Sequence, residues 1–146
     1  MKIVLTSDHG GVNIRNEIAS LLDEMNIEYD DLGCEGDCSV DYPDYGIPAA
    51  EKVAQGEYDF GILVCGTGIG MSMSANKVKG VRCALVHDVF SAKMTRQHNN
   101  ANVIALGERV IGPGLAREVV KAFLESEFEG GRHENRVSKM MAYEQN

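Results

Sequence analysis

The chain contains, at residues 60–70, the sequence Phe60-Gly-Ile-Leu-Val-Cys65-Gly-Thr-Gly-Ile-Gly70. An apolar run of this length that ends at a turn signal is typical of a buried strand, and a helical pattern follows the glycines. Glycine at residues 66, 68 and 70 permits a tight turn between the two elements. The segment therefore predicts a strand, a turn and a helix, the repeating unit of an α/β fold.

Short apolar runs alternate with helical patterns along the rest of the chain. Strands are predicted at 3–5, 27–32, 60–64, 83–86 and 103–106, and helices at about 14–25, 47–54, 70–78, 89–98 and 115–124. This alternation predicts one domain over residues 1–146, a three-layer α/β/α fold of the Rossmann or flavodoxin type with a five-stranded parallel sheet. The second strand is the most polar, which places it at an edge and favours the strand order 2-1-3-4-5.

The chain is acidic. It has 146 residues, 14 Lys and Arg against 22 Asp and Glu, and a net charge of −8. Such a charge argues against general binding to nucleic acid or to an anionic membrane. No apolar run approaches the ~20 residues that span a bilayer, and Met1-Lys2 leads into a strand-like segment instead of a signal-peptide pattern. We therefore expect a cytoplasmic protein without nucleic-acid or membrane partners.

Chemically active side chains follow several of the predicted strands. Ligands of open α/β sheets bind beyond the carboxyl ends of the strands. We therefore expect acids, histidines, a thiol and an arginine to gather at one edge of the sheet. The segments concerned, which include the end of the fourth helix, are Asp8-His9-Gly10-Gly11, Asp41-Tyr42-Pro43, Cys65 with the glycine loop, His87-Asp88, His98-Asn99-Asn100 and Gly107-Glu108-Arg109.

The glycine loop has the spacing G-x-G-x-G. It lacks the dinucleotide fingerprint G-x-G-x-x-G, because Met71 occupies the last position, and no lysine completes a Walker loop. Its amides are suited to hold a small anion at a helix N-terminus. A tight turn that needs glycine for packing explains the same residues equally well. The residues alone leave both interpretations open.

Cys65 and His98 are the candidates for proton transfer. Cys65 stands between the end of a strand and the start of a helix, a position that favours a reactive thiolate. The alternative is a buried cysteine that packs as a small apolar residue. His98 lies at the predicted end of a helix, where it can either donate a proton to a ligand or cap the helix.

Three arginines and two further histidines complete the set of candidates. Arg132 and Arg136 share a face if their segment is helical, and two guanidinium groups bind a phosphate well. A solvated charged tail is the alternative, and Arg109 has the same two interpretations. His9 suits an anion contact, whereas His87 suits a structural role.

No metal site is predicted. Cys34 and Cys38 form a single C-x3-C pair, without the second Cys/His pair that completes a tetrahedral site. A reducing cytosol also argues against a disulfide between them.

Together these segments resemble the ribose-5-phosphate isomerase B family and its relatives, the galactose-6-phosphate isomerase subunits. The resemblance covers nearly the whole chain, and it is the order and spacing of the motifs that is specific. The motifs are Ser7-Asp8-His9-Gly10-Gly11, Asp41-Tyr42-Pro43, Cys65-Gly66-Thr67-Gly68-Ile69-Gly70, Ala75-Asn76-Lys77, Arg96-Gln97-His98-Asn99, Asn102-Val103 and Glu129-Gly130-Gly131-Arg132-His133.

The resemblance implies an aldose–ketose isomerase of the pentose phosphate pathway that uses no metal or cofactor. It would interconvert D-ribose 5-phosphate and D-ribulose 5-phosphate through a cis-enediolate. Cys65 is then the base, because the stretch 71–75 lacks the glutamate of members without this cysteine. His98 opens the sugar ring as a general acid, and Thr67 and Asp8 assist catalysis.

The resemblance also implies a substrate-binding set and an oligomer. The loop amides stabilise the enediolate oxygen. Members form homodimers, sometimes paired into tetramers, whose sites combine both subunits, and residues 130–146 are expected to contact the partner subunit. The implied substrate-binding residues are Asp8, His9, Tyr42, Gly66, Thr67, Gly68, Ile69, Gly70, Asn99, Arg109, Arg132 and Arg136.

Two alternatives stay open from the sequence. An isomerase with the same mechanism can act on a six-carbon sugar phosphate, such as allose or galactose 6-phosphate, since one extra carbon changes specificity only modestly. A non-catalytic module that binds a sugar phosphate or nucleotide is the other alternative, because this architecture hosts many functions.

Overall fold

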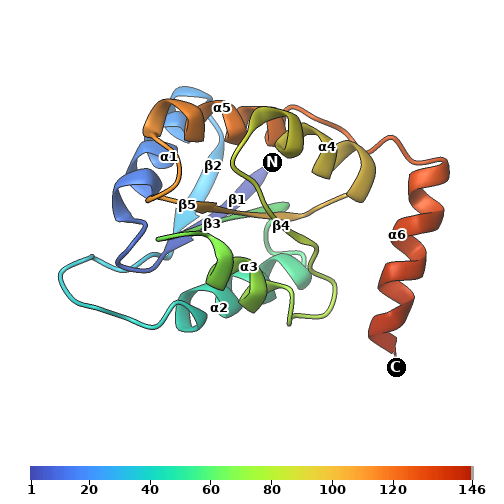
Figure 1. Cartoon of the computed structure of the whole chain (residues 1–146), viewed down its shortest axis with the longest axis horizontal. Helices are drawn as coiled ribbons and strands as arrows, with labels where there is room; N and C mark the ends of the chain where they lie inside the picture. The colour runs from blue at the N-terminus through green and yellow to red at the C-terminus, as the bar shows by residue number, and fades with distance from the viewer. Residues whose placement is uncertain (146) are drawn as a thin grey trace.

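The computed structural model describes residues 1–145, in which five strands alternate with helices (Figure 1). The strands are β1 (Lys2–Ser7), β2 (Glu28–Asp31), β3 (Phe60–Cys65), β4 (Cys83–Leu85) and β5 (Val103–Gly107). The helices are α1 (Val12–Glu24), α2 (Pro43–Ala54), α3 (Ile69–Ala75), α4 (Val89–Asn99), α5 (Pro113–Leu124) and α6 (Arg132–Ala142), followed by the 3₁₀ turn η1 (Tyr143–Gln145). All predicted strands and helices are present. The second helix begins earlier than predicted, at Pro43, a residue whose ring favours the first helical turn.

The strands form one parallel sheet in the order β2-β1-β3-β5-β4. The predicted parallel α/β fold with β2 at an edge is confirmed, but the predicted order of the last two strands is wrong. β5 is buried over its whole length, whereas the three residues of β4 are half-buried or exposed. A short, partly exposed strand suits a sheet edge. In the sequence both segments are short apolar runs, so hydropathy did not distinguish the central strand from the edge strand.

Helices cover both faces of the sheet (Figure 1). α1, α4 and α5 pack on one face, and α2 and α3 pack on the other. Leu5, Ile62 and Ile104 occupy matching register positions in β1, β3 and β5 and are fully buried under the first layer. This packed sheet fixes where each strand ends, and therefore where the side chains that follow the strands lie. Within residues 1–145, no helix has the length and apolar character needed to cross a membrane.

The C-terminal helix α6 leaves the body of the fold. It runs along one side of the molecule and contacts α4 (Figure 1). In this helix only His133 and Val137 are buried. A helix of three turns is marginal without packing partners, so α6 has less support from its own chain than the other helices. Asn146, the last residue of the predicted partner-contacting segment, lies outside the described residues.

Candidate active site

Cys65 is the last residue of β3 and pairs in register with Gly107 at the carboxyl end of β5. Its side chain is buried, and its Sγ accepts a hydrogen bond from the amide of Gly68 over 3.1 Å. The hydroxyl of Thr67 accepts a hydrogen bond from the amide of Ile69 over 3.3 Å. The loop therefore holds the thiol in one place and points an N–H dipole at the sulfur.

Gly68 makes this tight turn possible. Its φ is +77°, and a Cβ there would lie 2.6 Å from Cδ1 of Leu85 and 2.8 Å from the carbonyl carbon of Leu106. A side chain is therefore excluded both by conformation and by contact. The turn still leaves room for the anion interpretation. The amides of Gly66 and Thr67 donate no hydrogen bond within residues 1–145, so they are free to bind a ligand oxygen.

Asp8 and His9 lie against the glycine loop. Asp8 is buried, and its Oδ1 accepts a hydrogen bond from the amide of Gly10 over 2.8 Å. The chain passes so close to the loop that a Cβ on Gly10 would lie 3.1 Å from the nitrogen of Gly66. His9 is exposed, and its Nδ1 accepts a hydrogen bond from the amide of Val40 over 3.1 Å. The proton of this ring is therefore on Nε2, where it can be donated to an anion.

Tyr42 and Arg109 approach the loop from other elements. The ring of Tyr42 lies over Gly70, where a Cβ would be 2.8 Å from the ring carbons. The guanidinium of Arg109 lies beside Gly66, where a Cβ would be 3.2 Å from its Cζ. Both side chains are exposed to solvent. We name the following set the glycine-loop cluster: Asp8, His9, Tyr42, residues 65–70 and Arg109.

Glu108 fills the N-terminus of α1 and holds the segment that carries Arg109. Its carboxylate accepts hydrogen bonds from the amides of Asn13 and Ile14 over 2.9 and 3.0 Å, and from Nδ2 of Asn13 over 2.7 Å. The carboxylate satisfies amides that a helix start leaves unpaired. Sequence reasoning missed this role because Glu108 and Asn13 are 95 positions apart.

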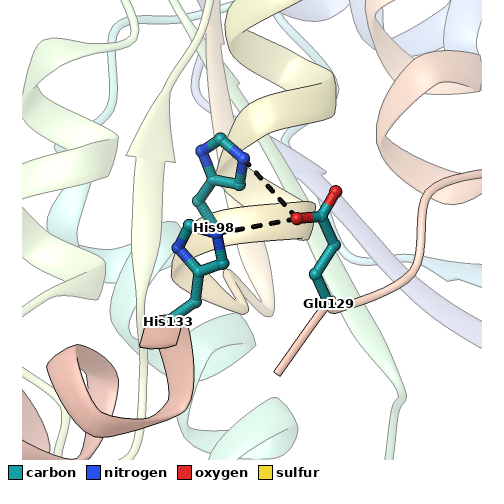
Figure 2. A group of neighbouring side chains, drawn as sticks. All are labelled: His98, Glu129 and His133. Carbon is teal, nitrogen blue, oxygen red and sulfur yellow. Dashed lines mark ion pairs between the residues drawn. The ribbon is translucent and has the colours of Figure 1, made fainter. Parts of the chain in front are cut away.

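Other predicted site residues lie together at the end of α4. A hollow of about 370 Å³ is lined by His98, Asn99, His133, Arg136, Val137 and Met140. The rings of His98 and His133 stack, with centroids 4.2 Å apart and an interplanar angle of 7°. The Oε2 atom of Glu129 lies 3.9 Å from Nε2 of His98 and 3.6 Å from Nε2 of His133 (Figure 2). We name the following set the His98 cluster: His98, Asn99, Glu129, His133 and Arg136.

Arg132 and Arg136 both belong to α6, so they lie on one helix as predicted. Both are exposed, with Arg132 at the first position of the helix and Arg136 one turn later. Arg136 therefore belongs to the His98 cluster, and Arg132 lies one turn before it on the same helix, away from the glycine loop.

The two clusters lie at opposite ends of the strands. The glycine-loop cluster lies at the carboxyl ends, and the His98 cluster lies at the amino ends. At the start of β3, the amide of Gly61 donates to the carbonyl of Asn102, just before β5. At the end of β3, Cys65 faces Gly107. Four strand residues, about 13 Å, separate these two levels. The expectation that all segments meet at one edge is therefore wrong for His98 within one chain, because a helix that returns between parallel strands ends at the amino edge of the sheet.

Burial changes the protonation of two histidines. Burial, together with the positive charge of His98, lowers the pKa of His133. Burial also lowers the pKa of His87, whose Nε2 accepts a hydrogen bond from the amide of Gly107 over 2.9 Å. An accepting nitrogen must be unprotonated. The predicted structural role of His87 is therefore confirmed, and the neutral ring supports the end of β5.

A second hollow, of about 550 Å³, is lined by Ser39, Val40, Asp41, Asp44 and Tyr45. Its two carboxylates repel an anion. The hollow is therefore poorly suited to a phosphate group, although Tyr42 lies in the same segment.

Residues 3–140 match the family described as Ribose/Galactose Isomerase. The chain belongs to this family. Three relatives illustrate the similarity. The Bacillus subtilis (strain 168) protein named "Putative sugar phosphate isomerase YwlF" is 66% identical over 146 residues, which cover 99% of this chain and 98% of that protein. Ribose-5-phosphate isomerase B of Escherichia coli (strain K12) is 44% identical over 144 residues, which cover 99% and 97%. The structure of Clostridium thermocellum ribose-5-phosphate isomerase B is 50% identical, covers 99% and 98%, and has a TM-score of 0.97.

These findings confirm the family resemblance and the α/β fold, and they make this ribose/galactose isomerase family member a sugar-phosphate isomerase. The roles of the individual residues stay predictions. Sequence reasoning gave no role to Glu129 and His133, although it quoted their motif. The signal available was their spacing of four residues, with a glycine pair between them that precedes a helix.

Proposed function

We propose that this ribose/galactose isomerase family member interconverts D-ribose 5-phosphate and D-ribulose 5-phosphate. The observation that carries the proposal is the buried thiol of Cys65, which accepts the amide hydrogen of Gly68 beside two unused amides. A non-catalytic binding module needs no such thiol. Two of the relatives described above are named for this activity.

The first step of the proposed mechanism opens the furanose ring. His98 acts as general acid at the ring oxygen, while a base removes the proton of the anomeric hydroxyl. Asp8 is the candidate for that base, since its buried carboxylate has a second oxygen beyond the one that holds Gly10. The product of this step is the open-chain aldose, which carries the carbonyl group that isomerisation requires.

Proton transfer between carbons is the second step. Cys65 removes the proton from C2, and the electrons of that bond move into a C1–C2 double bond as O1 becomes negative. The amides of Gly66 and Thr67 donate to this enediolate oxygen, and a donor so placed contributes roughly 100–1,000-fold in rate. Cys65 then returns the proton to C1 while O2 becomes the carbonyl oxygen. We assign to the hydroxyl of Thr67 the transfer of the remaining proton from O2 to O1.

The phosphate is held by cationic side chains of both clusters. His9 offers its Nε2 proton, and Arg109, Arg132 and Arg136 offer guanidinium groups, which form paired hydrogen bonds to phosphate oxygens. We assign the phenolic hydroxyl of Tyr42 and the side-chain amide of Asn99 to hydrogen bonds with the sugar hydroxyls.

We further propose a homodimer in which each site combines the glycine-loop cluster of one subunit with the His98 cluster of the other. Within one chain these clusters lie at opposite edges of the sheet, and α6 is largely exposed. Exposed apolar side chains of α3, β4 and the first turn of α4 also favour a partner surface. They are Ile69, Met73, Leu85, Val89 and Phe90.

The proposal is tested by an isomerase assay with five- and six-carbon aldose phosphates. We expect the highest kcat/KM for ribose 5-phosphate. The description of the family includes galactose, which favours a six-carbon sugar phosphate as the second candidate. A higher kcat/KM for allose or galactose 6-phosphate would replace the first proposal with the second.

The ring-opening role of His98 has its own test. D-erythrose 4-phosphate cannot close a furanose ring, because its O4 carries the phosphate. We expect His98→Asn to lower kcat/KM for ribose 5-phosphate by about 100-fold or more and to affect the four-carbon aldose far less. Equal losses on both substrates would contradict this role.

A further inference from the structure

Three potential metal ligands face one point at the end of α4. They are His98 of α4, Glu129 of the linker that follows α5, and His133 of α6 (Figure 2). Their ligand atoms all lie within 4.8 Å of one another, and Oε2 of Glu129 is 3.9 and 3.6 Å from the two Nε2 atoms. Ligands about 2.1 Å from a tetrahedral zinc ion are about 3.4 Å apart. The three atoms are therefore near ligand spacing, and both rings must turn out of their parallel stack to direct their Nε2 lone pairs at one ion.

The backbone holds the ligands in this arrangement. The amide of Glu129 donates to the carbonyl of Gln97 over 3.0 Å, which ties the linker to the residue before His98. The amide of His133 donates to the carbonyl of Gly130 over 3.0 Å. The two rings are already stacked. The backbone therefore keeps the three ligands near one another, and an ion would still have to order the carboxylate of Glu129 and tilt the two stacked rings.

The chemistry of the donors selects the class of ion. Two imidazoles and one carboxylate suit Zn²⁺, Co²⁺ or Ni²⁺, whereas Mg²⁺ and Ca²⁺ require mainly oxygen ligands. His133 is buried, and a histidine binds a metal through an unprotonated nitrogen. Arg136 lines the same hollow, and its positive charge repels a cation. The ion must therefore form strong bonds to the imidazoles in order to bind. The hollow of about 370 Å³ provides the path of entry.

We propose that His98, Glu129 and His133 bind one divalent ion of the zinc class, and that this ion inhibits the isomerase. Binding itself is independent of the proposed function, but inhibition rests on it. A nitrogen of His98 that ligates the ion no longer donates a proton, so the ring of the sugar stays closed. The site is thus inhibitory to the proposed mechanism, whose steps are assigned to side chains and amides.

Co²⁺ is the probe for binding, because its visible absorption reports tetrahedral coordination. We expect each chain to bind one Co²⁺ with a visible absorption band. The band should disappear when Zn²⁺ displaces the Co²⁺. Glu129→Gln keeps the size of an exposed side chain and removes its charge, and we expect it to weaken Co²⁺ binding about tenfold or more. Glu127→Gln, on the same linker and also exposed, is the matched control and retains the affinity of the unmodified protein. Equal Co²⁺ affinity in all three proteins, or the spectrum of the hydrated ion alone, would overturn the site.

Activity provides a separate measurement. We expect Zn²⁺ to inhibit ribose 5-phosphate isomerisation, EDTA to restore it, and Glu129→Gln to require about tenfold more Zn²⁺. Isomerase activity without a Co²⁺ band would overturn the metal site and leave the proposed function intact. A Co²⁺ band that Glu129→Gln weakens, in a protein without isomerase activity, would support the site and overturn the proposed function.

Discussion

Within one chain, Cys65 lies at the carboxyl ends of the parallel strands and His98 lies at their amino ends. Cys65 ends β3, and His98 lies in the last turn of α4, close to where β5 begins. A base and an acid that act on one sugar must lie within a few ångströms of it. If both residues act as proposed, they come from different subunits.

This separation predicts complementation between two inactive variants. Cys65→Ala and His98→Asn, each inactive alone on ribose 5-phosphate, should regain activity when their subunits are unfolded and refolded together. Each mixed dimer has one site with both residues intact, so about a quarter of all sites become active. Mixing the double variant with either single variant is the control. Absence of any recovery, in mixtures shown to contain mixed dimers, would place both residues in the same subunit's site.

The thiol of Cys65 is predicted to be the proton carrier. Cys65→Ala should lower kcat by about 100- to 10,000-fold while ribose 5-phosphate still raises the melting temperature of the protein. Cys83→Ala is the matched control, since Cys83 lies at the start of β4 outside both clusters and burial raises the pKa of its thiol to about 12. Full activity of Cys65→Ala would refute the assignment of the base.

Gly70 is predicted to be required for the placement of Tyr42. A Cβ on Gly70 would lie 2.8 Å from the Tyr42 ring, so Gly70→Ala should displace that ring and raise KM for the sugar phosphate severalfold. Gly114→Ala, in α5, meets nothing within 4 Å. It should keep KM and stabilise the protein by about 0.5–1 kcal/mol, as alanine does in a helix. A KM for Gly70→Ala equal to that of Gly114→Ala would contradict the assigned contact.

The neutral ring of His87 makes stability depend on pH. Burial lowers its pKa below the ordinary 6.5, so the unfolded chain takes up the proton first as the pH falls. The contribution of His87 to the free energy of unfolding should therefore be complete above about pH 7. It should decrease as the pH falls through about 6.5. His87→Ala should lose part of this slope, and His133, whose pKa is also lowered, contributes a further part. Urea unfolding between about pH 7.5 and 5.5 measures the slope, and an unchanged slope in His87→Ala would be evidence against this cause.

Glu108 is predicted to stabilise α1 and to position Arg109. Glu108→Ala removes the acceptor of the Asn13 and Ile14 amides and should cost about 0.5–2 kcal/mol in the free energy of unfolding, the range of a lost helix cap. Glu118→Ala is the control, because Glu118 pairs only with Lys121 on the surface of α5 among the described residues. Such a pair contributes little. Equal stability of the two variants would show that the cap is dispensable.

Much of the fold followed from local sequence patterns. Alternating apolar runs and helical periodicity predicted the five strands, the helices between them and the parallel sheet, because these patterns depend on residues near one another in the chain. The order of β4 and β5 depends on which strand gains more from burial between neighbours. That comparison involves side chains far apart in sequence, and hydropathy alone did not decide it.

By itself, the sequence determined the chemical groups of the candidate site and the family to which the chain belongs. The thiol and the glycine turn at residues 65–70 are local features. Arg132 and Arg136 lie in one helix, and their spacing of four residues places them on the same face. Only the tertiary structure placed the end of α4 at the far edge of the sheet, away from Cys65. Only it brought the carboxylate of Glu129 beside the stacked rings of His98 and His133. Residue types are written in the chain, whereas distances between them are fixed by how helices return across the sheet.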